Sequence, residues 1–170
     1  DNLIESTGKV ITHSKKVKTG LMQKLLTRGI GHVTFKKVPW LFGKEIEIPE
    51  EWEIRKLGDI TDKIGDGIHS TPNYVDNSEY YFINGNNLIN GKIMFSENTK
   101  NVNEEEFLKY ELKLNKNTVL LSINGTIGNV AFYNDEKIVL GKSASYIICN
   151  DNLDVVFFFY LLQSNIIKKY

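Results

Sequence analysis

The sequence has 170 residues, 41% of them hydrophobic and 25% charged, and its formal net charge is zero. This composition is typical of a globular protein and excludes disorder along the whole chain. The longest apolar run, residues 155–162, is far shorter than the roughly 20 residues that cross a bilayer, so we expect no membrane span. The chain begins without Met or a secretory leader, and its single cysteine, Cys149, cannot form an internal disulfide. We therefore expect a segment of a longer polypeptide that works in the reducing cytoplasm.

Positive charge is concentrated at the beginning of the chain. Residues 1–44 hold nine Lys or Arg and two acidic residues, a net charge of +7, and residues 45–170 carry the balancing −7. Such an asymmetry indicates either a basic arm that meets an anionic partner or a solvated helix face that is rich in lysine.

Residues 1–28 are predicted to form a helix. Four apolar residues recur along it at spacings of seven, four and four: Val10, Val17, Leu21 and Leu25. These spacings place the four side chains on one side of the helix. Arg28 in the last turn and Gly29 just beyond it provide a suitable helix end. Because a single helix cannot bury such a face on itself, we expect it to pack against a partner helix.

Residues 29–48 are predicted to be a connector, since glycines lie near its start and Pro39 and Pro49 lie at or near its end. From residue 49 onward, short runs alternate apolar and polar residues and most are bounded by Gly, Asn or Asp, which is typical of strands. The runs cover residues 80–83, 118–123, 129–133, 137–140 and 143–149.

Two short helices are expected among these strands. Asn103 followed by Glu106 resembles a capping box and predicts a helix through about residue 110. A second helix is predicted from residue 151 or 152 to Ser164, and its centre is apolar on every side, which indicates burial. The predicted fold class is therefore α+β, with an N-terminal helical arm followed by a mixed-sheet domain with short helices.

Candidate catalytic and metal sites are weak in this sequence. Three histidines lie far apart along the chain: His13, His32 and His69. Their spacing does not match a set of metal ligands, so no metal site is expected. Residues 111–113 (Glu-Leu-Lys), with Asp66 or Asp76, match a metal-dependent nuclease only loosely. The acidic-Pro-Pro-aromatic string of a methyltransferase is absent, and Cys149 in its apolar run is expected to be buried.

Three polar loops between the strands have an unusual composition. Residues 65–73, 84–90 and 122–129 concentrate Asn, Ser, Thr, Gly and His. Such residues favour turns, but Asn can also hydrogen-bond adenine, and Ser or Thr can hydrogen-bond several bases. Composition alone leaves both explanations open.

Several short strings occur in a fixed order along the chain. They are KTGLMQKLLT at residues 18–27, IPEEWE at 48–53, LGDI at 57–60, DGIHSTP at 66–72, NNL at 86–88, NGTIG at 124–128 and KSAS at 142–145. The first resembles the end of a central conserved helix, and the next two resemble the entry to a target-recognition domain. Together the strings resemble the specificity (S) subunit of type I restriction-modification systems.

This resemblance implies a subunit with two target-recognition domains joined by long conserved helices. The chain would then hold the end of the first spacer helix (1–28), a connector (29–48) and most of the second recognition domain (49–170), without that domain's final part and the helix that follows. The resemblance implies no catalytic centre and no cofactor bound by this chain. The subunit would read one half of a bipartite DNA site and dock two methyltransferase subunits that use S-adenosylmethionine. A separate restriction subunit would supply ATP-driven translocation and cleavage, with ATP and Mg²⁺ held by the partner subunits.

By the same resemblance, we expect the polar loops to contact double-stranded DNA. Three lysines are expected to cluster beside the loops and bind phosphates: Lys63, Lys92 and Lys142. Nine loop side chains are candidates for contacts with bases: His69, Ser70, Thr71, Asn73, Asn86, Asn87, Asn124, Thr126 and Ser143. The net charge of −7 opposes DNA binding, so we expect the acids to lie on the opposite face and the partner subunits to supply further positive charge. The alternatives are a protein-interaction module that works through its helical arm and, less favoured, a metal-dependent nuclease.

Overall fold

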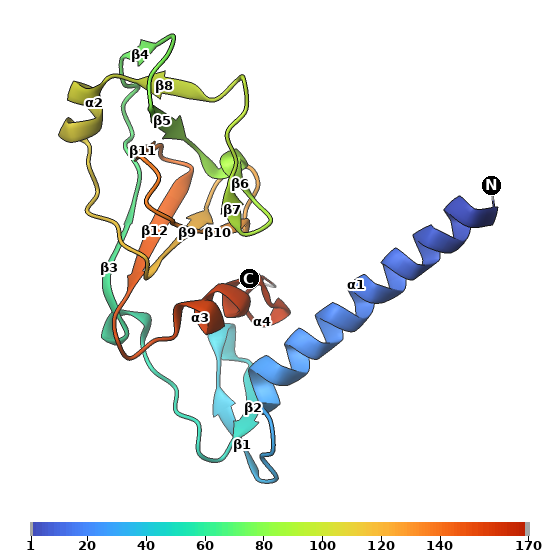
Figure 1. Ribbon diagram of the computed structural model, residues 1–170. Coiled ribbons are helices and arrows are strands. Elements are labelled where there is room, and N and C mark those ends of the chain that lie inside the picture. The colour runs from blue at the N-terminus through green and yellow to red at the C-terminus, as the bar shows by residue number, and fades with distance from the viewer. Residues whose placement is uncertain (1, 169–170) are drawn as a thin grey trace. The chain divides into compact units, whose positions relative to one another are not determined.

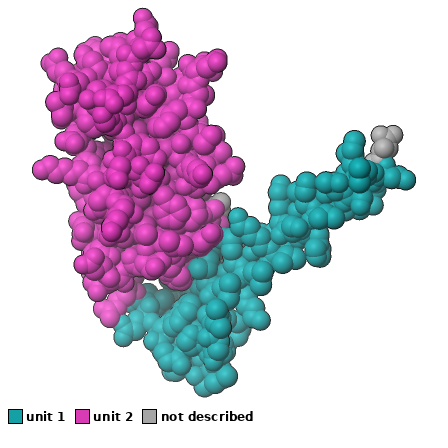
Figure 2. Space-filling model, in the orientation of Figure 1, with its two compact units in different colours: residues 1–54, 164–170 teal, residues 55–163 magenta. Residues whose placement is uncertain are grey.

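The computed structural model describes residues 2–168, which divide into two compact units (Figures 1 and 2). Among the described residues, the first unit is formed by residues 2–54 and 164–168, and the second by residues 55–163. No helix in the described part of the chain is long and apolar enough to cross a membrane.

The first unit contains a long helix that ends where it was predicted to end. Helix α1 (Asn2–Arg28) has 27 residues. Gly29 closes it at φ +60° by donating its N–H to the carbonyl oxygen of Leu25 at 3.0 Å. Glycine adopts this left-handed conformation without strain, so it is a common residue just after a helix. The predicted helix is therefore confirmed over its described residues.

The segment expected to be a connector folds into a β hairpin. Strands β1 (Phe35–Pro39) and β2 (Glu45–Pro49) pair in antiparallel register, from Phe35 opposite Pro49 to Pro39 opposite Glu45. Alternation in the second strand, Glu-Ile-Glu-Ile, is a strand signal that the neighbouring prolines obscured. The 3-10 helix η1 (Leu41–Gly43) lies between the strands, and the short helix α4 (Asn165–Lys168) belongs to the same unit.

Arg28 attaches the end of α1 to this hairpin. Its guanidinium group forms an ion pair with the carboxylate of Glu47 on β2. The same group lies over the ring of Phe35 on β1, 4.6 Å from the ring centroid. Both strands of the hairpin thus contact the last residue of the helix.

The second unit contains two four-stranded sheets and a small hairpin (Figure 1). One sheet is antiparallel and has the order β10 (Val130–Phe132), β9 (Thr118–Ser122), β12 (Ala144–Cys149), β3 (Thr61–Asp66). The other has the order β11 (Ile138–Leu140), β5 (Tyr80–Ile83), β8 (Lys100–Val102), β4 (Tyr74–Val75). Strand β11 runs parallel to β5, and β6 (Leu88–Ile89) pairs with β7 (Lys92–Ile93). The 3-10 helix η2 (Leu57–Asp59) precedes β3.

All five predicted strands are present, as β5, β9, β10, β11 and β12. The prediction missed β3, β4, β6, β7 and β8. Four of these have only two or three residues, and β3 (Thr-Asp-Lys-Ile-Gly-Asp) is mostly polar because it is an edge strand. Short or polar strands lack the apolar alternation that sequence reading depends on.

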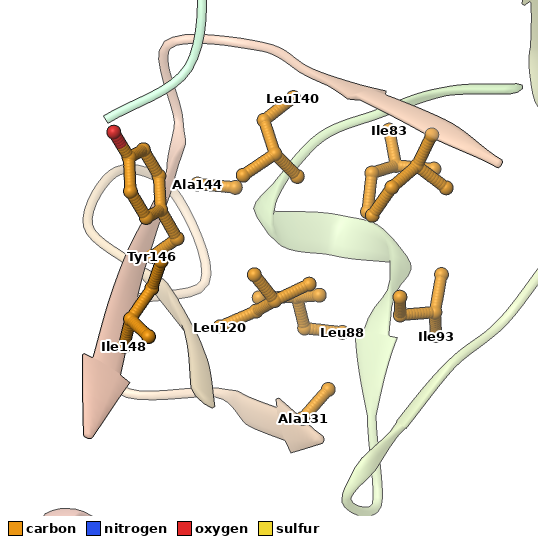
Figure 3. Close-up of a cluster of buried hydrophobic side chains, with 10 residues drawn as sticks. Ile83, Leu88, Ile93, Leu120, Ala131, Leu140, Ala144, Tyr146 and Ile148 are labelled. Carbon is orange, nitrogen blue, oxygen red and sulfur yellow. The ribbon is translucent and has the colours of Figure 1, made fainter. Parts of the chain in front are cut away.

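The core of the second unit is formed by side chains from both sheets and the small hairpin (Figure 3). Ile83, Leu88, Leu120 and Leu140 are among its completely buried members. Strand β12 is buried at all six positions because it lies between β9 and β3. Its last residue, Cys149, is buried as predicted, and burial raises the pKa of its thiol to about 11.

Helix α2 (Glu104–Lys109) begins at the predicted cap. The side-chain oxygen of Asn103 accepts the backbone N–H of Glu106 at 2.9 Å. Glu106 does not complete the expected capping box. Its buried carboxylate instead accepts the backbone N–H of Asn73 at 3.2 Å and pairs with Lys109 at 3.2 Å.

Helix α3 (Val155–Gln163) begins later than predicted and is only half buried. Its N-cap is Asp154, whose side chain accepts the N–H of Phe157 at 2.7 Å. One face is buried through Phe158, Phe159 and Leu162. The opposite face is 39–49% exposed at Val156, Phe157 and Tyr160. The expectation of burial on every side is therefore wrong, because the domain covers only one side of this apolar helix.

We expect Leu120→Ala to lower the free energy of unfolding by about 2–5 kcal/mol, because its fully buried side chain would leave a cavity. The matched control is Leu108→Ala on α2, where the side chain is 60% exposed. A change within about 0.5 kcal/mol is expected there. Denaturant titration measures both values, and equal losses would contradict this assignment of the core.

Candidate nucleic-acid interface

The turn between β11 and β12, residues 141–143, is the meeting point of the three polar loops. The N–H of Ala144 donates to the carbonyl oxygen of Gly141 at 3.0 Å, which closes the turn. The N–H of Gly141 donates to the carbonyl oxygen of Ile83 at 2.8 Å. Because β11 and β12 belong to different sheets, the turn also joins the two sheets.

The loop after β5 is held by Ser143. The Ser143 hydroxyl donates to the side-chain oxygen of Asn84 at 2.9 Å and accepts the N–H of Gly85 at 2.9 Å. Gly85 begins the 3-10 helix η3 (Gly85–Asn87), and a Cβ atom at this position would lie 2.1 Å from Oγ of Ser122. Only glycine fits here, so this loop and the loop after β9 are in direct contact.

The loop between β9 and β10 is closed by its own backbone and attached to the same turn. The N–H of Ser122 donates to the carbonyl oxygen of Asn129 at 2.8 Å, and the N–H of Gly128 donates to that of Ser122 at 3.0 Å. The N–H of Ile123 donates to the carbonyl oxygen of Ser143 at 3.0 Å. Ser143 therefore holds two loops, one through its hydroxyl and one through its carbonyl group.

The loop after β3 also contacts the residues on either side of this turn. Strand β3 is the edge strand next to β12 in the antiparallel sheet. The N–H of Gly67 donates to the carbonyl oxygen of Ala144 at 3.0 Å, and that of Ile68 to Leu140 at 2.7 Å. A Cβ atom on Gly67 would lie 2.3 Å from the carbonyl oxygen of Leu140, so a larger residue would force the loop away. Three segments that are far apart in the sequence thus attach to one turn.

Two of the predicted base-contacting side chains hold the loops instead. The side-chain oxygen of Asn87 accepts the N–H of Asn84 at 2.9 Å, and its amide nitrogen donates to the carbonyl oxygen of Met94 at 3.0 Å. The hydroxyl of Ser143 is likewise occupied within the domain, by its hydrogen bonds with Asn84 and Gly85. For these two residues, the geometry supports the turn explanation that the composition left open.

The other seven candidate base contacts are exposed on the loops: His69, Ser70, Thr71, Asn73, Asn86, Asn124 and Thr126. Asn86 and Asn124 belong to the two loops that touch between Gly85 and Ser122. Thr126 is exposed, although its hydroxyl lies 3.2 Å from Oγ of Ser122.

His69 and Ser70 each have a neighbour in the domain. Nε2 of His69 lies 2.7 Å from the carboxylate of Asp66, and this hydrogen bond lowers the pKa of Asp66. A contact from His69 to a ligand would therefore use Nδ1. Oγ of Ser70 lies 3.4 Å from the hydroxyl of Tyr110. This contact lowers the pKa of the Tyr110 phenol, and a smaller contribution in the same direction comes from Lys109.

The end of α2 is a part of this region that the sequence did not reveal. Lys109 lies over the ring of Tyr110, 4.7 Å from the centroid, and pairs with Glu106. Glu106 in turn holds the backbone of Asn73, at the end of the first polar loop. No sequence signal linked the helix to this loop, because 33 residues separate Asn73 from Glu106.

The three predicted lysines do not form one cluster. Lys142 is exposed in the turn itself. Lys63 lies opposite Ile148, three residues before Asp66, which is the residue of β3 nearest the turn, and its Nζ is 5.6 Å from the ring centroid of Tyr146. Lys92 pairs with Ile89 at the far end of the small hairpin, whose Gly91 contacts Phe159 of α3. Strand register, which the sequence does not show, separates these lysines.

The four predicted partner-helix residues are exposed along α1. The exposed fractions range from 43% to 62% at Val10, Val17, Leu21 and Leu25. Helix α1 has no buried residue along its described length. Its apolar face therefore has no cover within the described chain, and packing on a partner helix remains a prediction.

The residues considered for metal chemistry are not gathered into a site. Within residues 2–168, the structure has no group of three or more His, Cys, Asp or Glu side chains that could hold a metal ion. Of the acids considered for a nuclease, Asp66 is paired with His69.

Comparison with known proteins adds a decisive observation. Residues 49–170 match the type I restriction modification DNA specificity domain. The chain belongs to this family. The resemblance inferred from the ordered strings is therefore confirmed.

Two named specificity subunits share sequence with this chain. It is 31% identical over 179 residues to the type I restriction enzyme MjaVIII specificity subunit of Methanocaldococcus jannaschii, covering 99% of this chain and 40% of that protein. It is 47% identical over 60 residues to the putative MjaX specificity subunit of the same organism, covering 34% of this chain and 13% of that protein. The chain thus spans well under half of these relatives.

Two solved structures have the same fold at low sequence identity. The HsdS subunit from Thermoanaerobacter tengcongensis matches with a TM-score of 0.59 and 18% identity, over 95% of this chain and 37% of that one. The type I restriction-modification S subunit from M. genitalium matches with a TM-score of 0.52 and 16% identity, over 99% and 40%. The predicted α+β fold class, a helical arm followed by mixed sheets and short helices, is confirmed.

We expect Ser143→Ala to lower the free energy of unfolding by about 1–3 kcal/mol, because it removes the partner of the Gly85 N–H and of the Asn84 side chain. The neighbouring exposed residue provides the control: Lys142→Ala should change stability by less than about 0.5 kcal/mol. Denaturant titration of the two variants measures the difference. If Ser143→Ala is as stable as the control, Ser143 does not hold the loops.

Proposed function

We propose that the protein containing this chain is a non-catalytic subunit of a type I restriction-modification complex, and that residues 55–163 read one half of a bipartite DNA sequence. The observation that carries the proposal is the convergence of three polar loops on the turn at residues 141–143. Family membership supports a role in DNA specificity, because the matched domain is defined by that role. The named specificity subunits among the relatives support it further.

The division between polar side chains that bond within the domain and those that are exposed supports direct contacts with bases. Asn87 and Ser143 hold the loops, whereas Asn86 and Asn124 present their amides to solvent. An Asn side chain can donate one hydrogen bond to adenine and accept another from it in the major groove. This pair of bonds distinguishes adenine from the other bases. We therefore assign base contacts first to the exposed amides.

Phosphate contacts position a protein on DNA without specifying sequence. Lys142 is the predicted lysine that lies at the meeting point of the loops. Residues 45–170 hold twelve Lys or Arg against nineteen acidic residues, a net charge of −7, so the affinity of the domain for DNA depends on positive charge from the partner subunits.

Helix α1 is the proposed docking element for those partners. Its exposed apolar face includes Val10, Val17, Leu21 and Leu25. Complete burial of one such side chain contributes about 1.5–3 kcal/mol to the free energy of association. Packing of this face against a partner helix and against methyltransferase subunits therefore favours assembly. S-adenosylmethionine, ATP and Mg²⁺ would be held by the methyltransferase and restriction subunits, and the complex would act on DNA in the cytoplasm.

The test uses the intact subunit assembled with its methyltransferase partners. Asn124→Ala is expected to cost about 1–3 kcal/mol of binding free energy on the selected target and little on a scrambled duplex, because a base contact is lost. Lys142→Ala should weaken binding to both duplexes alike and reduce the slope of log affinity against log salt by about 0.9, because a phosphate contact is lost. Fluorescence anisotropy at several salt concentrations measures both effects.

A second candidate function is a protein-interaction module without sequence-specific DNA contacts. The exposed apolar face of α1 favours it, since this face needs a protein partner whether or not the domain binds DNA. The same titrations separate the two functions. Equal affinity of the wild-type complex for selected and scrambled duplexes would exclude the recognition function and leave the interaction module.

A further inference from the structure

Ile127 is the most exposed large apolar side chain in the second unit. It is 77% exposed, and the next in residues 55–163 is Leu108 at 60%. Single exposed apolar residues are common on protein surfaces, so exposure alone assigns no role. The backbone that holds Ile127 and the residues that surround its loop provide the further argument.

The backbone around Ile127 is fixed by hydrogen bonds and by two glycines. Gly125 and Gly128 lie on either side of the Thr126-Ile127 pair at φ values of +72° and +86°. The N–H of Gly128 donates to Ser122, and the N–H of Asn129 donates to the carbonyl oxygen of Thr126 at 3.2 Å. The loop is therefore ordered before any ligand binds, and little conformational entropy would be lost when Ile127 makes a contact.

The loop that carries Ile127 lies among the proposed DNA contacts. The N–H of Ile123 donates to the carbonyl oxygen of Ser143, next to Lys142. Ser122, at the base of the loop, touches Gly85, next to Asn86. Ile127 is thus presented beside exposed polar and charged residues, Asn86 and Lys142, and is more exposed than the other large apolar residue of its loop, Ile123 at 37%.

We propose that Ile127 is the apolar contact of this surface with the bases of DNA, an inference that rests on the proposed function. Two parts of a duplex offer the required chemistry. The C5-methyl group of thymine is exposed in the major groove, and aliphatic side chains pack against it. The face of a base pair becomes accessible when an aliphatic side chain enters between two steps from the minor groove.

The experiment compares variants of the intact subunit, assembled with its methyltransferase partners, on a duplex selected by the wild-type complex from random DNA. Ile127→Ser is expected to lower the affinity about tenfold, the size of one base contact, and Ile127→Leu to retain most of it. The salt dependence should stay as in the wild type, because no phosphate contact is lost. The matched control is Val156→Ser on α3, an exposed aliphatic residue on another element, which should bind as the wild type.

Modified duplexes identify which part of the base is contacted. If Ile127 packs on a thymine methyl group, replacing that thymine by uracil lowers wild-type affinity to the level of Ile127→Ser and does not weaken the variant further. If Ile127 enters between base pairs, uracil has no effect, and 2-aminopurine at one step becomes more fluorescent with the wild type than with Ile127→Ser. If neither the uracil substitution nor the 2-aminopurine signal distinguishes the wild type from Ile127→Ser, the inference is wrong.

Two other outcomes separate this inference from the proposed function. If the wild-type complex prefers its selected duplex and Ile127→Ser binds as tightly as Val156→Ser, the inference is wrong while the proposed function stands. If the wild-type complex has no sequence preference, both are wrong. A loss with Ile127→Ser that is accompanied by a smaller salt slope also overturns the inference, because the loop would then act through phosphates.

Discussion

The hydrogen bonds of Ser143 are the constraint that holds two of the three loops of the proposed recognition surface together. Its hydroxyl holds the loop after β5, and its carbonyl group holds the loop after β9. These bonds can form only because Gly85 and Gly141 have no side chain, since a Cβ atom on either would lie within 2.4 Å of Ser122 or Asn84. The turn therefore combines a polar residue that attracts the loops with glycines that let their backbones approach.

A consequence of this construction is that polar residues of one type serve two purposes. Asn84 and Asn87 satisfy groups within the domain, while Asn86 between them is exposed. The inner amides fix the backbone, and a fixed backbone presents the outer amide in one orientation. Ordered polar groups lose less entropy on binding than mobile ones, so the inner hydrogen bonds support the proposed selectivity of the outer groups.

The sequence predicted those features that depend on apolar periodicity. The helix over residues 1–28 and the buried strands, including β12, were found because burial imposes a regular pattern. The edge strand β3 was missed because its side chains are mostly polar. The inner role of Asn87 could not be predicted, because Asn suits a turn and a base equally well. The separation of Lys63 from Lys142 depends on strand register, which composition does not encode.

The parallel pairing of β11 with β5 determines when this surface can exist. Residues 138–140 align with residues 81–83, and β12 must then pair with both β9 and β3. These contacts join residues far apart along the chain, so each of them requires the closure of a long loop. A ribosome must therefore release the chain beyond Cys149 before the three loops can meet. Until then, the nascent polypeptide contains the separate loop segments, but these segments have not yet come together into one surface.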